Sequence, residues 1–310
     1  MRRGPRVRVG VPPPAASLKR GARRGDTGDM LPVYSHEART YRWPYATVTL
    51  IGINVLAFVF ELSVGARFVP FLQEWGLVPA RVNAEVTSHN LLTLVTAMFL
   101  HVGWIHLLGN MWFLFVFGDA VEDAFGWRWF VAIYLLSGFF ANIAFMVATS
   151  SSSVPAIGAS GAIAGVMGAS LVLWPTARLK IFTILLMAWA FYLCYEVLVA
   201  VGTPSIVLGG SVLFVLSMIG SVVWYAAGRQ RKTGQGFVYT LFVAVTLPAW
   251  VVLGLFFLTN LWSGALSVVS PAYGGAVGWW AHIGGFVAGA VLAKLFPKRP
   301  IVLAKRALLG

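Results

Sequence analysis

The sequence is poor in charged residues and in cysteine. Only 11% of its 310 residues are charged and 59% are hydrophobic, whereas an average soluble domain has about 25% charged and about 45–50% apolar residues. So few charges cannot cover the surface of a soluble protein. The one cysteine, Cys194, excludes a disulfide framework within the chain and a cysteine-based zinc module. The composition therefore predicts an integral membrane protein.

Long apolar runs recur along the chain. A bilayer core of about 30 Å requires about 20 apolar helical residues. Eight such runs occur, at about 47–65, 103–121, 129–149, 158–174, 181–201, 205–227, 237–259 and 277–296. The predicted fold is an all-α membrane protein, a polytopic bundle of about eight transmembrane helices.

Acidic residues are scarce, with ten Asp and Glu against 23 Lys and Arg, and the net charge is +13. In a soluble protein such an excess suggests nucleic-acid binding. Here ten of the basic residues lie in residues 1–46, and with eight spans 21 of the 23 fall on one side, leaving Arg67 and Arg81 on the other. The positive-inside rule then places both termini in the cytoplasm. The charge therefore predicts orientation in a bilayer and no nucleic-acid partner.

Composition also divides the chain into segments. Residues 1–43 are basic, interrupted by prolines and without the apolar core of a signal peptide, which predicts a disordered cytoplasmic tail. Residues 44–297 form the predicted membrane domain, and residues 298–310 a second basic cytoplasmic tail.

Polar groups within the apolar runs are costly and often functional, and four of these side chains are candidates for a site. His106 and Asn110 are four residues apart, so they share one helix face, and both can donate hydrogen bonds. Hydrogen bonding between helices is the alternative role for this pair. Ser160 stands among small residues, which by themselves indicate a helix-packing face. His282 precedes Gly285 and Gly289, which are spaced for close helix contact.

These four side chains together favour nucleophilic catalysis. Ser160 and His282 are predicted at the outer ends of two spans that run in the same direction, so the imidazole can activate the hydroxyl. His106, Asn110 and the backbone N–H of Ser160 can stabilise the oxyanion. Because no Asp or Glu lies near these ends, we expect a Ser–His dyad, which needs no metal or organic cofactor. The chain lacks the G-x-S-x-G, H-E-x-x-H and paired-Asp patterns of other hydrolases.

Four short motifs carry these residues in a set order. They are His106-x-x-x-Asn110, Gly118-x-x-x-Glu122-x-x-x-Gly126, Gly158-x-Ser160-Gly161 and Ala281-His282-x-x-Gly285. Together they resemble the rhomboid family of intramembrane serine proteases, over residues 44–175 and 237–297.

The resemblance implies a function for each group. Ser160 would be the nucleophile, His282 the general base and acid, and His106, Asn110 and the Ser160 N–H the oxyanion hole. Glu122 would tie helix ends together, and the remaining motif residues would be structural: Gly118, Gly126, Gly158, Gly161, Gly285 and Gly289. The implied activity is that of a serine endopeptidase that cuts transmembrane protein substrates within the lipid bilayer. The implied location is the bacterial plasma membrane.

The chain departs from the family pattern in several places. Three spans, where one is common, separate Ser160 from His282, so residues 181–227, which include Glu196, are predicted to be an inserted helical hairpin. An even insertion keeps both side chains on one side of the membrane. Ala164 replaces an aromatic residue that stacks on the histidine in some rhomboids. Because residues 30–32 resemble the usual start of the family, residues 1–29 are expected to be an extension or to follow from a misassigned start codon.

The sequence has two alternative functional interpretations besides proteolysis. A catalytically silent rhomboid-like factor could bind membrane proteins without cutting them, using the inserted hairpin as a docking surface. The intact Ser160 and His282 argue against it. A transporter would favour internal repeats, and the sequence has none visible.

Overall fold

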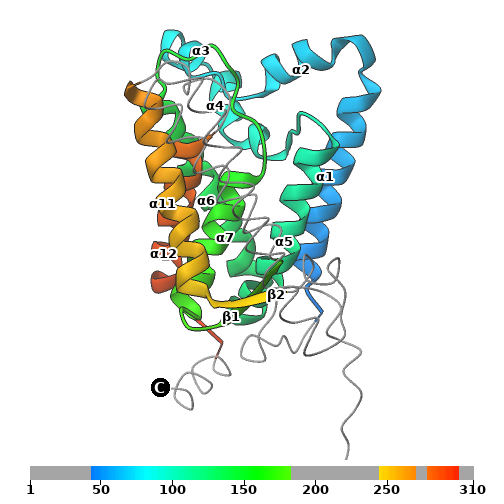
Figure 1. Ribbon diagram of the computed structural model, residues 1–310. Helices are drawn as coiled ribbons and strands as arrows, with labels where there is room; N and C mark the ends of the chain where they lie inside the picture. Colours follow the sequence, from blue (N-terminus) through cyan, green and yellow to red (C-terminus); the bar gives the residue numbers. More distant parts are fainter. Residues whose placement is uncertain (1–42, 183–243, 270–277, 300–310) are drawn as a thin grey trace, which may run out of the picture. The chain divides into compact units, whose positions relative to one another are not determined.

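The computed structural model describes residues 43–182, 244–269 and 278–299, all within one compact unit of the chain. These residues are mostly helical (Figure 1). The helices are α1 (Tyr45–Ser63), α2 (Phe68–Trp75), α3 (Pro79–Ala84), α4 (Ser88–Thr96), α5 (Trp104–Phe125), α6 (Trp127–Ala148), α7 (Ser160–Leu173), α11 (Ala249–Val269) and α12 (Trp279–Leu295). Short 3-10 turns, Gly65–Arg67 and Ala97–Phe99, precede α2 and follow α4.

Four of these helices are long and apolar enough to cross a membrane, namely α1, α5, α6 and α11. Helices α7 and α12 are apolar but shorter, with 14 and 17 residues. Helices α1, α5, α6, α7 and α12 occupy the first four and the last of the predicted apolar runs. Beyond residue 182, the fifth and sixth runs and the predicted hairpin lie outside the described residues, as do Glu196 and nearly all of both predicted tails.

The predicted boundaries of the seventh run were wrong. Its residues 244–248 form a strand, and α11 begins only at Ala249 and continues to Val269. The predicted run ended at about residue 259, whereas the helix passes through the polar residues Thr259 and Asn260. The Thr259 hydroxyl donates to the Leu255 carbonyl at 2.7 Å and the Asn260 amide donates to the Phe256 carbonyl at 2.8 Å. Bonds of this kind satisfy polar side chains within the helix, so the helix continues.

A two-stranded antiparallel sheet is the exception to the predicted all-α fold. Strand β1 (Arg178–Phe182) pairs with β2 (Ala244–Pro248), and Phe182 lies opposite Ala244. The Ala249 N–H donates to the Ala177 carbonyl at 2.7 Å, which places the start of α11 beside the end of α7 (Figure 1). Phe182 and Ala244, the last and first described residues on either side of this gap, are therefore paired across adjacent strands.

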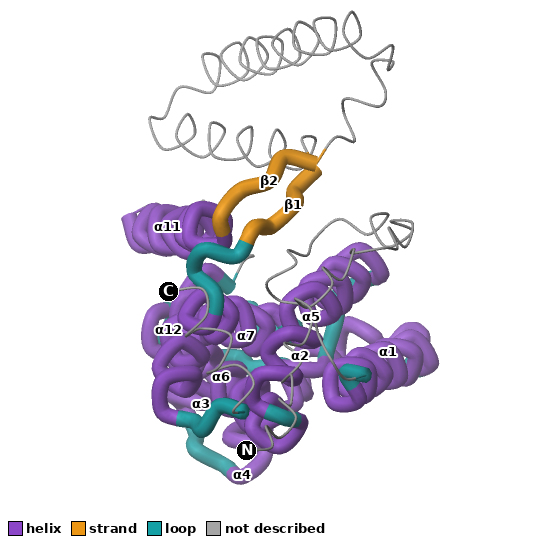
Figure 2. Tube along the Cα trace, turned by 90° about the horizontal axis from the view of Figure 1, so that it is seen from below, coloured by secondary structure: helices purple, strands orange, loops and turns teal. Residues whose placement is uncertain are grey.

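Helix α7 packs against α5, α6 and α12 (Figure 2). Its contact with α12 is close enough to involve the backbones directly. A Cβ added at Gly285 would overlap the Gly161 carbonyl, and one at Gly289 would overlap the Gly165 carbonyl. From the first pair to the second, the contact moves four residues toward the C-terminus in both helices. Helices α7 and α12 therefore run parallel. Small residues permit such close approach between helices in membranes.

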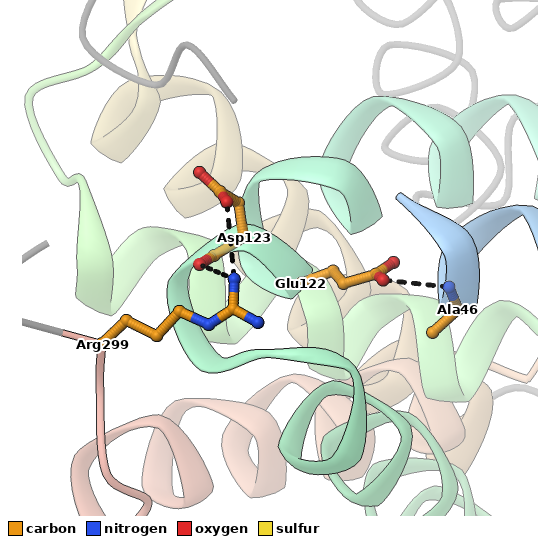
Figure 3. Close-up of polar contacts among 4 residues, drawn as sticks. All are labelled: Ala46, Glu122, Asp123 and Arg299. Carbon is orange, nitrogen blue, oxygen red and sulfur yellow. Dashed lines mark hydrogen bonds and ion pairs between the residues drawn. The ribbon is translucent and has the colours of Figure 1, made fainter. Parts of the chain in front are cut away.

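The N-terminus of α1 is capped by a carboxylate from α5. Glu122 is buried, and one of its oxygens accepts a hydrogen bond from the Ala46 N–H at 2.9 Å (Figure 3). The other oxygen accepts one from the Thr47 N–H at 2.8 Å. The Thr47 hydroxyl donates to the second oxygen at 2.8 Å. The first N–H groups of a helix have no partner within the helix and attract negative charge. Glu122 therefore joins the start of α1 to the end of α5.

The turn between α5 and α6 is a single residue, Gly126, with φ +81°. This backbone conformation favours glycine. The Arg299 side chain crosses the turn, so that a Cβ at Gly126 would lie 2.8 Å from Arg299 Nη2. Arg299 Nη1 lies 3.7 Å from an Asp123 carboxylate oxygen (Figure 3). The Arg299 N–H donates to the Ala124 carbonyl. The residues after α12 are thereby attached to the end of α5.

We predict that Glu122→Ala lowers the free energy of unfolding by about 2–3 kcal/mol, because three buried donors lose a charged acceptor. Unfolding in mixed micelles with increasing SDS measures this value. Glu85→Ala, which removes an exposed carboxylate, should change it by less than about 0.5 kcal/mol. Equal losses in the two variants would contradict the capping role.

A matched pair of glycines tests the contact between α7 and α12. We predict that Gly289→Ala destabilises the protein by about 1–3 kcal/mol, because the added methyl group overlaps the α7 backbone. Gly254→Ala on α11 has nothing within 4 Å of the new Cβ. It should leave stability unchanged or raise it by up to about 1 kcal/mol. The same SDS titration compares the two, and a tolerated Gly289→Ala would show that the backbones do not meet here.

Candidate active site

Ser160 and His282 lie in contact although 122 residues separate them in the chain. His282 Nε2 is 2.9 Å from Ser160 Oγ. Ser160 is the first residue of α7 and His282 the fourth of α12, and the parallel glycine contact brings these two helix starts to the same level. The structure therefore joins the hydroxyl and the imidazole that the sequence singled out.

The other ring nitrogen of His282 contacts a residue that the sequence analysis missed. His282 Nδ1 is 2.7 Å from Oδ1 of Asn260, which is 3% exposed and belongs to α11. The expectation of a dyad rested on the absence of Asp and Glu near His282, and the predicted apolar run ended at about residue 259. The sequence feature that could have pointed to this partner is the amide of Asn260, one residue after a predicted apolar run.

Two aromatic rings also lie against the imidazole. The ring centroids of Phe256 and Trp279 are 6.0 and 6.3 Å from that of His282. Phe256 is on α11, one helical turn before Asn260. Ala164, where the family resemblance suggested that an aromatic residue was missing, is buried in the core. The imidazole is thus contacted by α11 and by its own helix instead.

His106 and Asn110 approach the segment that leads into Ser160. A Cβ at Gly158, where φ is +126°, would lie 2.7 Å from His106 Cε1 and 3.6 Å from Asn110 Nδ2. Asn110 Nδ2 and His106 Nδ1 are buried without a hydrogen-bond partner among the described residues. The N–H of Ser160 belongs to the first turn of α7, where backbone donors lack helical partners. His106 and Asn110 therefore lie beside the segment that leads into Ser160, and the Ser160 N–H is a further donor at its end.

All four of these side chains line one cavity of about 770 Å³. Its walls come from α2, α5, α6, α7, α11, α12 and the segment before α7. Phe68, Val69 and Leu72 of α2 contribute an apolar wall. The cavity thus combines apolar surface with a small set of converging polar groups, as ligand sites generally do.

A family model described as "Rhomboid domain" matches residues 88–226. The chain belongs to the rhomboid family. It is similar to "Rhomboid protease GluP" of Bacillus subtilis, with 35% identity over 129 residues, which are 41% of this chain and 24% of that protein. It is also similar to "RHOMBOID-like protein 6, mitochondrial" of Arabidopsis thaliana, with 45% identity over 78 residues and 25% of each chain.

A third relative extends the match. "Presenilin-associated rhomboid-like protein A, mitochondrial" of Danio rerio is 29% identical over 163 residues, which are 51% of this chain and 42% of that protein. The chain therefore matches between about a quarter and two fifths of the length of these three relatives. The similarity identifies the family and a membrane-embedded fold, and the reaction of this rhomboid is a separate question.

The remaining motif residues of this rhomboid lie at two places. Gly118, Glu122 and Gly126 are at the end of α5 remote from His106, where Gly118 faces Thr47 and Glu122 caps α1. Gly161, Gly285 and Gly289 form the contact between α7 and α12. In the parts of the chain that the structure describes, no group of three or more His, Cys, Asp or Glu residues is arranged to hold a metal ion.

A buried carboxylate supports the backbone that leads into α5. Glu61 Oε2 accepts a hydrogen bond from the His101 N–H at 3.0 Å, and both residues have no exposed surface. The His101 ring lies 5.2 Å from that of His106. Burial, and to a smaller extent the electrostatic effect of His106, lowers the pKa of His101 to about 4. His101 is therefore neutral at pH 7 and adds no charge beside His106.

Proposed function

We propose that this rhomboid is an intramembrane serine endopeptidase that hydrolyses peptide bonds in or near transmembrane segments of membrane proteins. The observation that carries the proposal is the 2.9 Å contact between Ser160 Oγ and His282 Nε2 inside a cavity that also contains donors for an oxyanion. A serine hydroxyl becomes nucleophilic when an adjacent base takes its proton. The similarity to a protein named as a rhomboid protease adds support.

The proposed reaction uses only groups of the chain and water. His282 Nε2 accepts the hydroxyl proton as Ser160 Oγ bonds to the scissile carbonyl carbon. The resulting oxyanion receives hydrogen bonds from the Ser160 N–H, His106 and Asn110. His282 then donates the proton to the leaving amine, and an acyl-enzyme ester remains on Ser160. Water, activated by the same imidazole, hydrolyses this ester and regenerates the hydroxyl.

The substrate must expose a backbone carbonyl to Ser160. A continuous transmembrane helix uses its carbonyls in internal hydrogen bonds, because the bilayer core offers no other partner. Segments that unwind readily are therefore the proposed substrates. The apolar wall from α2 suits such a segment, since apolar side chains next to the cleaved bond would remain out of water.

The proposed topology has eight spans with both termini in the cytoplasm and the Ser160–His282 pair toward the outer face. It is supported by the basic residues, 21 of which fall on one side in this arrangement. Phe182 and Ala244 are paired in the sheet and so lie on the same side of the membrane. This supports an even number of membrane crossings by the chain between these two residues. A bacterial plasma membrane is the proposed location, although relatives named as mitochondrial and chloroplastic also match.

We predict that Ser160→Ala abolishes cleavage of a model transmembrane substrate by the purified protein in detergent micelles, and that His282→Ala does the same. Ser170→Ala, the same change further along α7, should retain wild-type cleavage. Fluorophosphonate labelling separates the protease from a silent rhomboid-like binding factor, because only the protease should react. Unchanged cleavage by Ser160→Ala would refute the proposal.

If Asn110 stabilises the oxyanion, its removal should lower the reaction rate without abolishing it. Asn110→Ala should lower kcat by about 10²–10³-fold, with a much smaller change in KM, because the lost donor acts mainly in the transition state. Asn54→Ala is the matched control, since Asn54 is a buried amide on α1 that donates to its own helix at Leu50. It should lower stability while kcat stays within about twofold. A wild-type kcat for Asn110→Ala would show that Asn110 does not stabilise the oxyanion.

A further inference from the structure

Asn260 is a buried polar residue in an apolar helix that the dyad mechanism does not use. It lies on α11, is 3% exposed, and both polar atoms of its amide are engaged. Burying an amide in an apolar bundle is costly unless its hydrogen bonds are made. Its contact with His282 can therefore do more than supply a hydrogen-bond partner to the buried amide and imidazole.

The orientation of the Asn260 amide follows from its second hydrogen bond. Nδ2 donates to the Phe256 carbonyl at 2.8 Å, which leaves Oδ1 facing His282 Nδ1 at 2.7 Å. In the flipped orientation Oδ1 would face a carbonyl oxygen, and two acceptors would meet. The backbone of α11 therefore selects the oxygen as the atom presented to the imidazole.

An oxygen acceptor at Nδ1 determines which imidazole nitrogen carries the proton. In a neutral imidazole one nitrogen is a donor and the other an acceptor. Because Oδ1 can only accept, Nδ1 must carry the hydrogen, and the lone pair is then on Nε2. Nε2 is the atom 2.9 Å from Ser160 Oγ, so this tautomer is the one that can take the hydroxyl proton.

The aromatic neighbours cannot make this selection. Phe256 and Trp279 lie against the ring at centroid distances of 6.0 and 6.3 Å. Such contacts restrict the position of the imidazole, but they do not distinguish its two nitrogens. The hydrogen bond from Nδ1 is directional and does so.

We propose that Asn260 is a positioning residue for the reaction. It holds His282 in the Nδ1–H tautomer and in the ring orientation that directs Nε2 at Ser160. The inference rests on the proposed protease function and extends the expected dyad to a Ser160–His282–Asn260 chain. A neutral acceptor also avoids the cost of burying a carboxylate among apolar helices.

Three variants test the proposal in the full chain. Asn260→Leu is close in size but lacks the acceptor, Asn260→Asp keeps an acceptor oxygen, and Thr259→Val is the control. Thr259 is the neighbouring buried residue on α11, and within the described residues its hydroxyl donates to its own helix at Leu255. SDS titration of each variant reports any loss of stability separately from activity.

Asn260→Leu should lower kcat on a model transmembrane substrate by about 10²-fold, with KM changed less than about twofold, because general-base catalysis requires the correct tautomer. Asn260→Asp should recover kcat to within about tenfold of wild type. Thr259→Val should match wild type. A purely structural role would make the size-matched leucine at least as active as the aspartate.

Nitrogen-15 NMR of the His282 ring gives a readout that does not depend on the variants. In the wild-type protein the expected spectrum has protonated Nδ1 and unprotonated Nε2. The Nε2–H tautomer in the wild type would overturn the inference, even if Asn260→Leu failed to fold. If Asn260→Leu has the wild-type kcat and Ser160→Ala is inactive, the inference about Asn260 is overturned while the proposed protease function stands. Activity in Ser160→Ala would instead overturn the proposed function.

Discussion

The arrangement of the site depends on the direct contact between the backbones of α7 and α12. Gly285 faces the Gly161 carbonyl, and Gly289 faces the Gly165 carbonyl. Any side chain at these positions would separate the helices and lengthen the hydrogen bond between Ser160 and His282. The nucleophile candidate stands at the first residue of its helix, so the same packing also presents free backbone N–H groups beside it.

Several polar groups elsewhere in the apolar bundle and beside this pair have partners close by. Thr259 and Asn260 bond to the turn of α11 that precedes them, and Glu122 bonds to the start of α1. A bilayer offers no compensating water, so each of these bonds keeps a polar residue compatible with its helix. The same rule explains why Asn260 can stand beside His282, since its amide is held by its own backbone.

Much of this could be predicted from sequence, and the exceptions have physical causes. Composition and apolar length predicted α1, α5 and α6, because lipid imposes a simple rule on such helices. Spacing of His106 and Asn110 predicted their shared helix face. The extent of α11 was missed, because residues that bond to their own helix resemble a helix end. Asn260 was missed with it, since its partner lies on another helix and only the folded chain brings them together.

The proposed mechanism requires His282 to activate Ser160. Peptide mapping by mass spectrometry after treatment with a fluorophosphonate tests this requirement directly. We expect one adduct, on Ser160, in the wild-type protein and none in a folded His282→Ala variant. An adduct at another residue, or equal labelling of Ser160 without the imidazole, would contradict it.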